Sequence, residues 1–123
     1  MGNKKIETHE DTIDLRALGE RVGGSTELLS EILQIFLENY PEAIAKVREA
    51  VALHDAQRLE KAAHGFRGYL VSFHAKRAAA AALDLETMAR RGEMANVEET
   101  FARLQREMDL LMPVLASIDR RQA

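Results

Sequence analysis

The chain has 123 residues, a formal net charge of −3 and no cysteine. This length suits one ordinary domain, and the lack of cysteine excludes disulfides, thiol catalysis and zinc or iron–sulfur sites with cysteine ligands. The acidic charge gives no support for nucleic-acid binding, and no apolar run approaches the roughly 20 residues that cross a bilayer. We therefore expect a cytoplasmic protein that binds neither nucleic acid nor membrane.

The first elements of the chain are short. Residues 1–11 are polar and aperiodic, and we interpret them as a flexible N-terminal arm. A short helix is expected from Thr12 or Asp14 to about Arg21, where the glycine pair at 23–24 ends it.

A long helix should follow, with Ser25 as its N-cap. Apolar residues recur at helical spacing up to Val51, so the pattern extends over more than 20 residues. Pro41 lies inside it and cannot donate the usual backbone hydrogen bond. We expect a kink or break between Asn39 and Pro41.

Two further helices are expected in the centre of the chain. Asp55 should cap a helix over about 55–73, and another should run from about 75 to 91, where Gly92 stops it. The five-alanine run at 78–82 is typical of a tightly packed helix.

The last helix begins after Asn96, or as early as Glu93, and Pro113 should kink it or mark a joint. Short connections between long amphipathic helices favour antiparallel neighbours. The prediction is an all-α fold: an antiparallel four-helix bundle over residues 12–118 with a short additional N-terminal helix, and a C-terminal tail at 119–123. The apolar stripes suffice for the bundle itself, so we expect a monomer.

His64 is predicted to face away from this core. On a helical wheel its position lies about 160° from the centre of the apolar stripe, whereas a histidine that only filled the core would lie on the stripe. The stripe residues are Leu59, Ala62, Ala63, Phe66, Tyr69, Leu70 and Phe73.

The residues around His64 point to anion or phosphoryl chemistry. Gly68 lies one turn further on, where a side chain would crowd the imidazole, and each helical glycine costs about 1 kcal/mol relative to alanine. Gly65 could allow the backbone of a partner to approach. Arg67 has a donor fork suited to phosphate oxygens, and Lys61 flanks the other side of the ring.

The surrounding outer face is suited to docking. Between residues 55 and 77 there are five lysines or arginines and two acids, a local charge of +3. Val71 is apolar on this polar face, as a docking surface requires, and Gln57 lies on the same face. Each feature has an ordinary surface interpretation when taken alone. Their combination favours a phosphoryl-handling role.

The motif HGFRG at 64–68 resembles the signature of histidine phosphotransfer (HPt) domains. In that family a His, a Lys or Arg three residues later and a Gly four residues later lie in mid-helix of a four-helix bundle. The likeness spans about residues 12–118 and includes Ile-Asp-Leu at 13–15, Gly-Gly at 23–24, Phe-Leu-Glu-x-x-Pro-Glu at 36–42, Asp55, Ala63-His64, Leu85-Glu86 and Gly92.

The resemblance implies that His64 accepts a phosphoryl group from a receiver-domain aspartate through Nε2 and returns it to another aspartate. It implies that Arg67, in place of the usual Lys, stabilises the phosphoryl charge and that Gly68 keeps the approach open. Lys61, Gly65, Val71 and Gln57 would contact the partner. Neutral imidazole is a competent nucleophile at cytosolic pH, and phosphoryl transfer depends mainly on positioning and charge stabilisation.

The same resemblance implies the partners and cofactors. Receiver domains of response regulators or hybrid histidine kinases would bind the chain, and Mg²⁺ would belong to the receiver. The chain would bind no cofactor and would be a carrier without its own kinase or ATP-binding domain, rather than an enzyme.

Three residues depart from the family pattern. Gly65 stands where Ser or Thr is common, Tyr69 is bulkier than the usual residue, and His74 replaces a Gly at the end of the helix. Histidine tolerates a positive φ better than most residues, so this turn can form. The departures bear on transfer rate and partner choice.

The sequence allows two other functions to be considered. The first is a helical bundle that docks a receiver or kinase without chemistry. The second is a metal or haem bundle, but His54, His64 and His74 are ten residues apart, which rotates each about 80° from the last, so they do not share a face. No metal site is therefore predicted.

Overall fold

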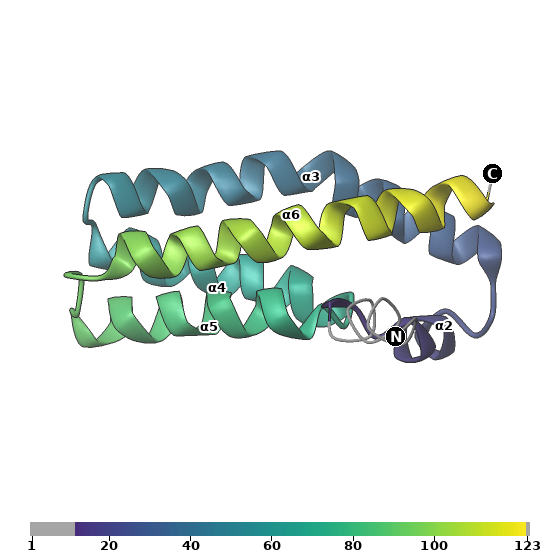
Figure 1. The fold of residues 1–123 in the computed structure, drawn as a ribbon, viewed down its shortest axis with the longest axis horizontal. Helices are drawn as coiled ribbons and strands as arrows, with labels where there is room; N and C mark the ends of the chain where they lie inside the picture. The colour runs from purple at the N-terminus through teal and green to yellow at the C-terminus, as the bar shows by residue number, and fades with distance from the viewer. Residues whose placement is uncertain (1–11, 123) are drawn as a thin grey trace, which may run out of the picture.

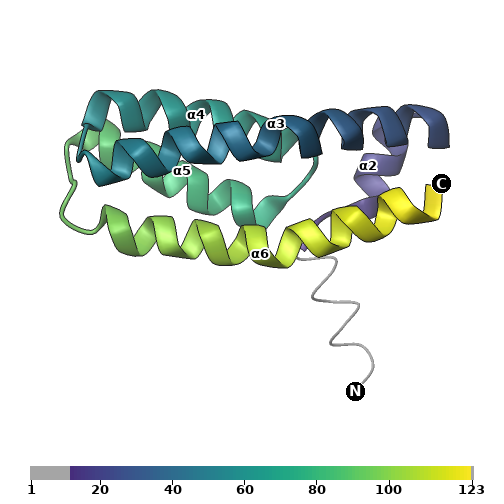
Figure 2. The same ribbon diagram turned by 90° about the horizontal axis from the view of Figure 1, so that it is seen from above.

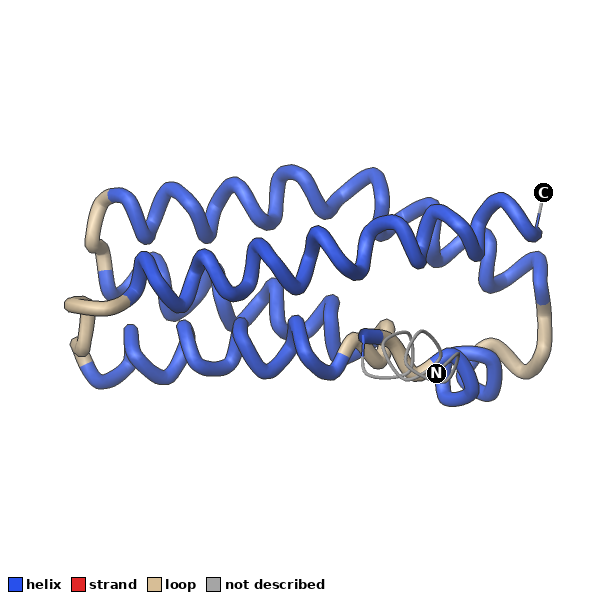
Figure 3. Tube along the Cα trace, in the orientation of Figure 1, coloured by secondary structure: helices blue, strands red, loops and turns tan. Residues whose placement is uncertain are grey.

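The computed structural model describes residues 12–122, and side chains up to residue 118. The predicted arm at 1–11 lies outside the described residues. In the described part the fold is all-α, without strands, as predicted (Figure 3). Its labelled helices are α2 (Leu15–Arg21), α3 (Thr26–Ala52), α4 (Ala56–Ser72), α5 (Lys76–Arg91) and α6 (Val97–Gln122).

The four long helices form an antiparallel bundle (Figure 1). The principal contacts join α3 to α4, α4 to α5, α5 to α6 and α6 back to α3, so each helix packs on two neighbours. The short helix α2 lies beyond the end of α5, beside the parts of α3 and α6 that extend past the shorter helices (Figure 2). α6 continues to Gln122 and so includes most of the predicted tail.

Side-chain caps begin three of the helices. The carboxylate or hydroxyl oxygen of Asp14, Ser25 and Asp55 accepts the backbone N–H three residues later, at 3.0, 3.1 and 3.1 Å respectively. Such a bond satisfies one of the amide groups left free in the first turn of a helix. The predicted caps at Ser25 and Asp55 are confirmed.

The turns between helices use residues with positive φ. Gly92 ends α5 with a φ of 70°, as expected. His54 and His74 end the turns after α3 and α4 with φ values of 51° and 56°. Histidine therefore occupies the turn position at residue 74, as the sequence analysis allowed.

Neither proline interrupts its helix. α3 passes through Pro41 and α6 passes through Pro113, so the break considered at the first and the joint considered at the second are not present. A proline removes its own amide hydrogen bond and crowds the carbonyl four residues earlier, and tertiary packing can outweigh this local cost. Both helices pack on two neighbouring helices of the bundle.

The core confirms most of the apolar stripe predicted for α4. Leu59, Ala63, Phe66 and Leu70 are at most 1% exposed. Tyr69 is an exception, since 40% of it is exposed. Its ring lies at the border of the core, where it packs edge-on against Phe36 with centroids 6.3 Å apart. The prediction that it faces the core was therefore wrong.

The entry to α2 is fixed to the turn between α4 and α5. The amide of Asp14 donates to the carbonyl of His74 at 3.0 Å, and Lys76 Nζ lies 3.5 Å from the Asp14 carboxylate. Ile13 and Leu18 are buried at 0% and 1% exposure. Among the described helices, none combines the length and apolar character needed to cross a membrane.

Candidate functional site

His64 lies in the middle of α4 and points out of the bundle. Its side chain is 66% exposed, as the helical wheel predicted. The outward position follows from the burial of Ala63 and Phe66 on either side of it in the sequence, because those residues fix the rotation of the helix about its axis.

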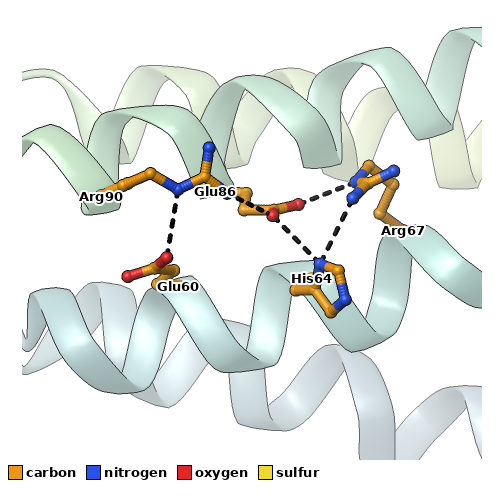
Figure 4. A network of polar contacts seen from close by, with 5 residues as sticks. All are labelled: Glu60, His64, Arg67, Glu86 and Arg90. Carbon is orange, nitrogen blue, oxygen red and sulfur yellow. Dashed lines mark hydrogen bonds and ion pairs between the residues drawn. The ribbon is translucent and has the colours of Figure 1, made fainter.

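One nitrogen of this exposed ring contacts a buried carboxylate. His64 Nδ1 lies 3.0 Å from Oε2 of Glu86, whose side chain is only 3% exposed. Arg67 Nε donates to the other oxygen, Oε1, at 2.7 Å. Figure 4 shows the carboxylate contacting both the ring and the guanidinium, with the second ring nitrogen directed away from it.

A second arginine completes the cluster. Arg90 donates through one terminal nitrogen to Oε2 of Glu86 at 2.7 Å and through Nε to Glu60 at 3.2 Å. Glu86 is thus bound by groups from α4 and α5 together, and the cluster links the two helices beneath the imidazole (Figure 4).

The pKa of Glu86 lies below the value of 4.5 usual for glutamate. Burial by itself raises this pKa, but the hydrogen bonds from Arg67 and His64, with the charges of the same two residues, more than offset the burial. The carboxylate is therefore ionised at neutral pH, although almost no water reaches it.

The ionised state of Glu86 determines the tautomer of His64. A carboxylate only accepts hydrogen bonds, so Nδ1 must carry the hydrogen that it donates to Oε2. The nearest terminal nitrogen of Arg67, 3.2 Å from Nδ1, then lies beside the ring without donating to it. Nε2 consequently holds the free lone pair, and it is the nitrogen that faces away from the cluster.

Sequence reasoning did not assign a role to Glu86, Arg90 or Glu60. The sequence does contain an indication that Glu86 has a role. The inner stripe of α5 consists of small or aliphatic residues apart from one glutamate: Ala78, Ala81, Ala82, Leu85, Glu86 and Ala89. A carboxylate on a buried stripe requires a cationic or hydrogen-bonding partner, and Arg90 follows one turn later.

The local positive charge is more strongly compensated than the sequence suggested. Of the five cations between residues 55 and 77, four form ion pairs, and Lys61 alone has none within the described chain. The pairs are Arg58 with Glu49, Arg67 with Glu86, Lys76 with Asp14, and Arg77 with Glu107. Of these five cations, Lys61 is therefore the one whose charge is not balanced by an acid in the described chain.

Gly68 and Gly65 leave open space on the outer face of α4. A Cβ atom at either position would meet no atom within 4 Å. The expectation that a side chain at residue 68 would crowd the imidazole is therefore wrong for a methyl group. Because the protein itself does not fill this space, it is accessible to an approaching molecule.

The predicted docking residues lie on two sides of His64. Gln57 and Lys61 line a shallow groove with His64 and Glu86. Val71, which is 53% exposed, lines a separate groove with Arg67, the other residues being His74, Ala75, Lys76, Ala79, Ala80 and Leu83. The second groove is mainly apolar and includes Leu83, which is 44% exposed.

The other described histidines do not reproduce this arrangement. His54 contacts Glu98, but that carboxylate is 58% exposed and the histidine lies in a turn. Among residues 12–122, no group of three or more metal-binding side chains is close enough to hold an ion.

Comparisons with known proteins bear on the family and the fold of the chain. The model of the Hpt domain family matches residues 31–112, which is more than half of the chain. A crystal structure of histidine-containing phosphotransfer protein B (HptB) from Pseudomonas aeruginosa PAO1 is similar with a TM-score of 0.83 and 24% sequence identity. The match covers 89% of this chain and 96% of that chain, and it supports the fold. No curated protein matches the sequence.

Proposed function

Because the chain belongs to the Hpt domain family, whose members carry phosphoryl groups on histidine in phosphorelays, we propose that His64 is its phosphoryl acceptor. The observation that carries the proposal is the exposed imidazole whose Nδ1 is bound by a buried carboxylate, so that Nε2 is free. An attacking nitrogen needs a free lone pair, a fixed direction and an open approach.

The transfer can proceed without moving a proton. The Nε2 lone pair attacks the phosphorus of an aspartyl phosphate, the Nε2–P bond forms, and the P–O bond breaks with its electron pair on the departing carboxylate. The ring keeps its Nδ1 hydrogen and becomes positively charged. Glu86, 3.0 Å from Nδ1, stabilises that positive charge. In the return step the electron pair goes back to Nε2 and the ring becomes neutral again.

Arg67 is the cation best placed to contact the phosphoryl group. Its side chain is 28% exposed, and a terminal nitrogen lies 3.2 Å from the ring. A modest rotation about its side-chain bonds would turn the guanidinium from Glu86 to the phosphoryl oxygens, which it can bind through two nitrogens at once.

The partner in this proposal is a receiver domain. It supplies the aspartate and the Mg²⁺, so the chain itself needs no metal and acts as a monomeric carrier rather than as a kinase. The cations near His64 complement the negative charge of such an acidic site. Val71 and its apolar groove would contact the surface of the receiver beside that site.

The direct test incubates the purified protein with phosphorylated receiver domains encoded in its own genome. We expect transfer of a label that is labile in acid and stable in base, as a phosphohistidine is. Stable binding of receivers with no transfer from any of them would instead identify a docking module without chemistry.

Replacing Gly68 with alanine should separate stability from function. The added methyl group meets nothing in the protein and favours the helix, so the free energy of unfolding should rise by about 0.5–1 kcal/mol. Transfer from a receiver should nevertheless slow, because the methyl group occupies the path of the partner. Denaturant unfolding and transfer kinetics measure the two effects.

Gly19→Ala is the matched control for this substitution. Gly19 is also helical, and a Cβ atom there also meets nothing within 4 Å. This variant should gain stability and transfer at the wild-type rate. Equal transfer rates for both variants and the wild type would remove the role assigned to Gly68.

Replacing Val71 with serine should weaken docking without changing the chemistry of His64. The loss of apolar contact predicts roughly tenfold lower kcat/KM for transfer from a receiver. Labelling of His64 by phosphoramidate, a small donor that needs no docking surface, should be unchanged. Leu110→Ser on α6 is the control, since Leu110 is 44% exposed. Equal receiver kinetics in the two variants would exclude Val71 from the interface.

A further inference from the structure

Glu86 is bound by two arginines, and these differ in their surroundings. Arg67 lies on α4 next to the reacting ring, and its only other close polar neighbour among the described contacts is His64. Arg90 lies on α5, one helical turn after Glu86, and is held at the same time by Glu60 on α4. Of the two arginines, Arg67 is the one in contact with the ring of His64, with a terminal nitrogen 3.2 Å from Nδ1.

Phosphorylation of His64 would change the interactions of Arg67 and Arg90. A phosphoryl group on Nε2 brings additional negative charge to the site, and a rotation that turns the Arg67 guanidinium towards it would weaken the bond from Arg67 Nε to Glu86. A buried carboxylate that loses its cation is strongly destabilised, because water cannot replace the lost interaction. While Arg67 is engaged elsewhere, the groups left to hold Glu86 are the positively charged ring of His64 and Arg90.

Resting on the proposed function, we propose that Arg90 is a positioning residue that holds Glu86 ionised and in place, freeing Arg67 to bind the phosphoryl group. Two contacts suit Arg90 to this role. It binds Oε2 of Glu86, the same oxygen that accepts from His64 Nδ1, at 2.7 Å. Its contact with Glu60 at 3.2 Å fixes the guanidinium independently of His64.

The arrangement preserves the tautomer of His64 throughout the transfer. As long as Arg90 keeps Glu86 ionised, the carboxylate accepts the Nδ1 hydrogen whether or not Arg67 is present. Nε2 then remains the nitrogen that bonds to phosphorus and later takes back the electron pair. Arg90 itself does not touch the reacting atoms, and it acts through Glu86.

The test compares Arg90→Gln and Arg90→Lys with the wild type. Arg103→Gln is the control, because Arg103 is an exposed arginine paired with Asp84 away from the cluster. The first readout is the ratio of Nδ1–H to Nε2–H tautomers of neutral His64, from the ring ¹⁵N chemical shifts. The second is the rate of phosphohistidine formation with phosphoramidate, followed by ³¹P NMR.

We expect Arg90→Gln to increase the Nε2–H fraction and to slow labelling about tenfold, a typical effect of losing a residue that orients a functional imidazole. Arg90→Lys should restore most of both values, and Arg103→Gln should match the wild type. A wild-type tautomer ratio and rate in Arg90→Gln would overturn the role of Arg90.

The outcomes separate this inference from the proposed function. If the wild type forms no phosphohistidine at His64, the proposed function fails, whatever the tautomer ratio in the variants. If the wild type is labelled at His64 and Arg90→Gln behaves identically, only the inference about Arg90 fails. A variant that fails to fold would lose its helical circular dichroism signal. If Arg90→Gln does so, the comparison is made between Arg90→Lys and the wild type.

Discussion

Replacing His64 with glutamine should abolish phosphoryl uptake and leave the fold unchanged. The ring is 66% exposed and makes no core contact that the bundle requires, so the free energy of unfolding should change by less than about 1 kcal/mol. Glutamine has no nucleophilic nitrogen, and no other described histidine combines exposure with a buried carboxylate. Labelling with phosphoramidate and with a phosphorylated receiver should both fall below detection.

His54→Gln is the matched control for this variant. His54 is also exposed and also contacts a glutamate, but it lies in a turn and its partner is exposed. The control should be labelled at the wild-type rate. Acid-labile labelling that persists in His64→Gln would mean that another residue accepts the phosphoryl group.

Replacing Glu86 with glutamine should have the second largest effect on transfer. The amide preserves the size of the side chain but removes its charge, so Nδ1–H loses its ionised acceptor and the two arginines lose their shared counter-ion. We expect phosphoramidate labelling of His64 to slow by about ten- to a hundredfold. An unchanged rate would show that the carboxylate does not orient the ring.

The same variant should change how stability depends on pH. The pKa of Glu86 is lower in the folded protein than the usual 4.5, so its ionised form contributes stability above that value. The contribution is lost as the pH falls from about 4.5 through the folded-state pKa. The difference in unfolding free energy between wild type and Glu86→Gln should therefore be largest near neutral pH and shrink in acid. Denaturant titrations over pH 3–7 measure it; a difference independent of pH would contradict the assignment.

Much of the fold could be predicted because local signals agreed with one another. Ser25 and Asp55 are strong capping residues followed by regular apolar spacing, and Gly92 stops a helix in the way that glycine commonly does. The prolines did not end their helices, because the penalty of a proline is local. Whether a helix continues past Pro41 depends on packing against α4 and α6, which the local sequence does not contain.

The part of the site that lies on α4 could be predicted, and the part that lies on α5 could not. His64, Arg67 and Gly68 lie on one helix, so helical geometry alone places them together. Glu86 and Arg90 come from a second helix, and their distance from His64 depends on the rotation of α5 against α4. A lone glutamate on an otherwise apolar stripe shows that a partner must exist, but it does not identify that partner.

The proposed transfer requires that phosphorus bonds to one particular ring nitrogen of one particular histidine. The most direct measurement is NMR of the ¹⁵N-labelled protein after phosphorylation, in which ³¹P coupling identifies the modified ring nitrogen. The arrangement of Glu86 and His64 predicts coupling to Nε2 of His64, with Nδ1 still carrying its hydrogen. Coupling to Nδ1, or to the ring of any other histidine, would contradict it.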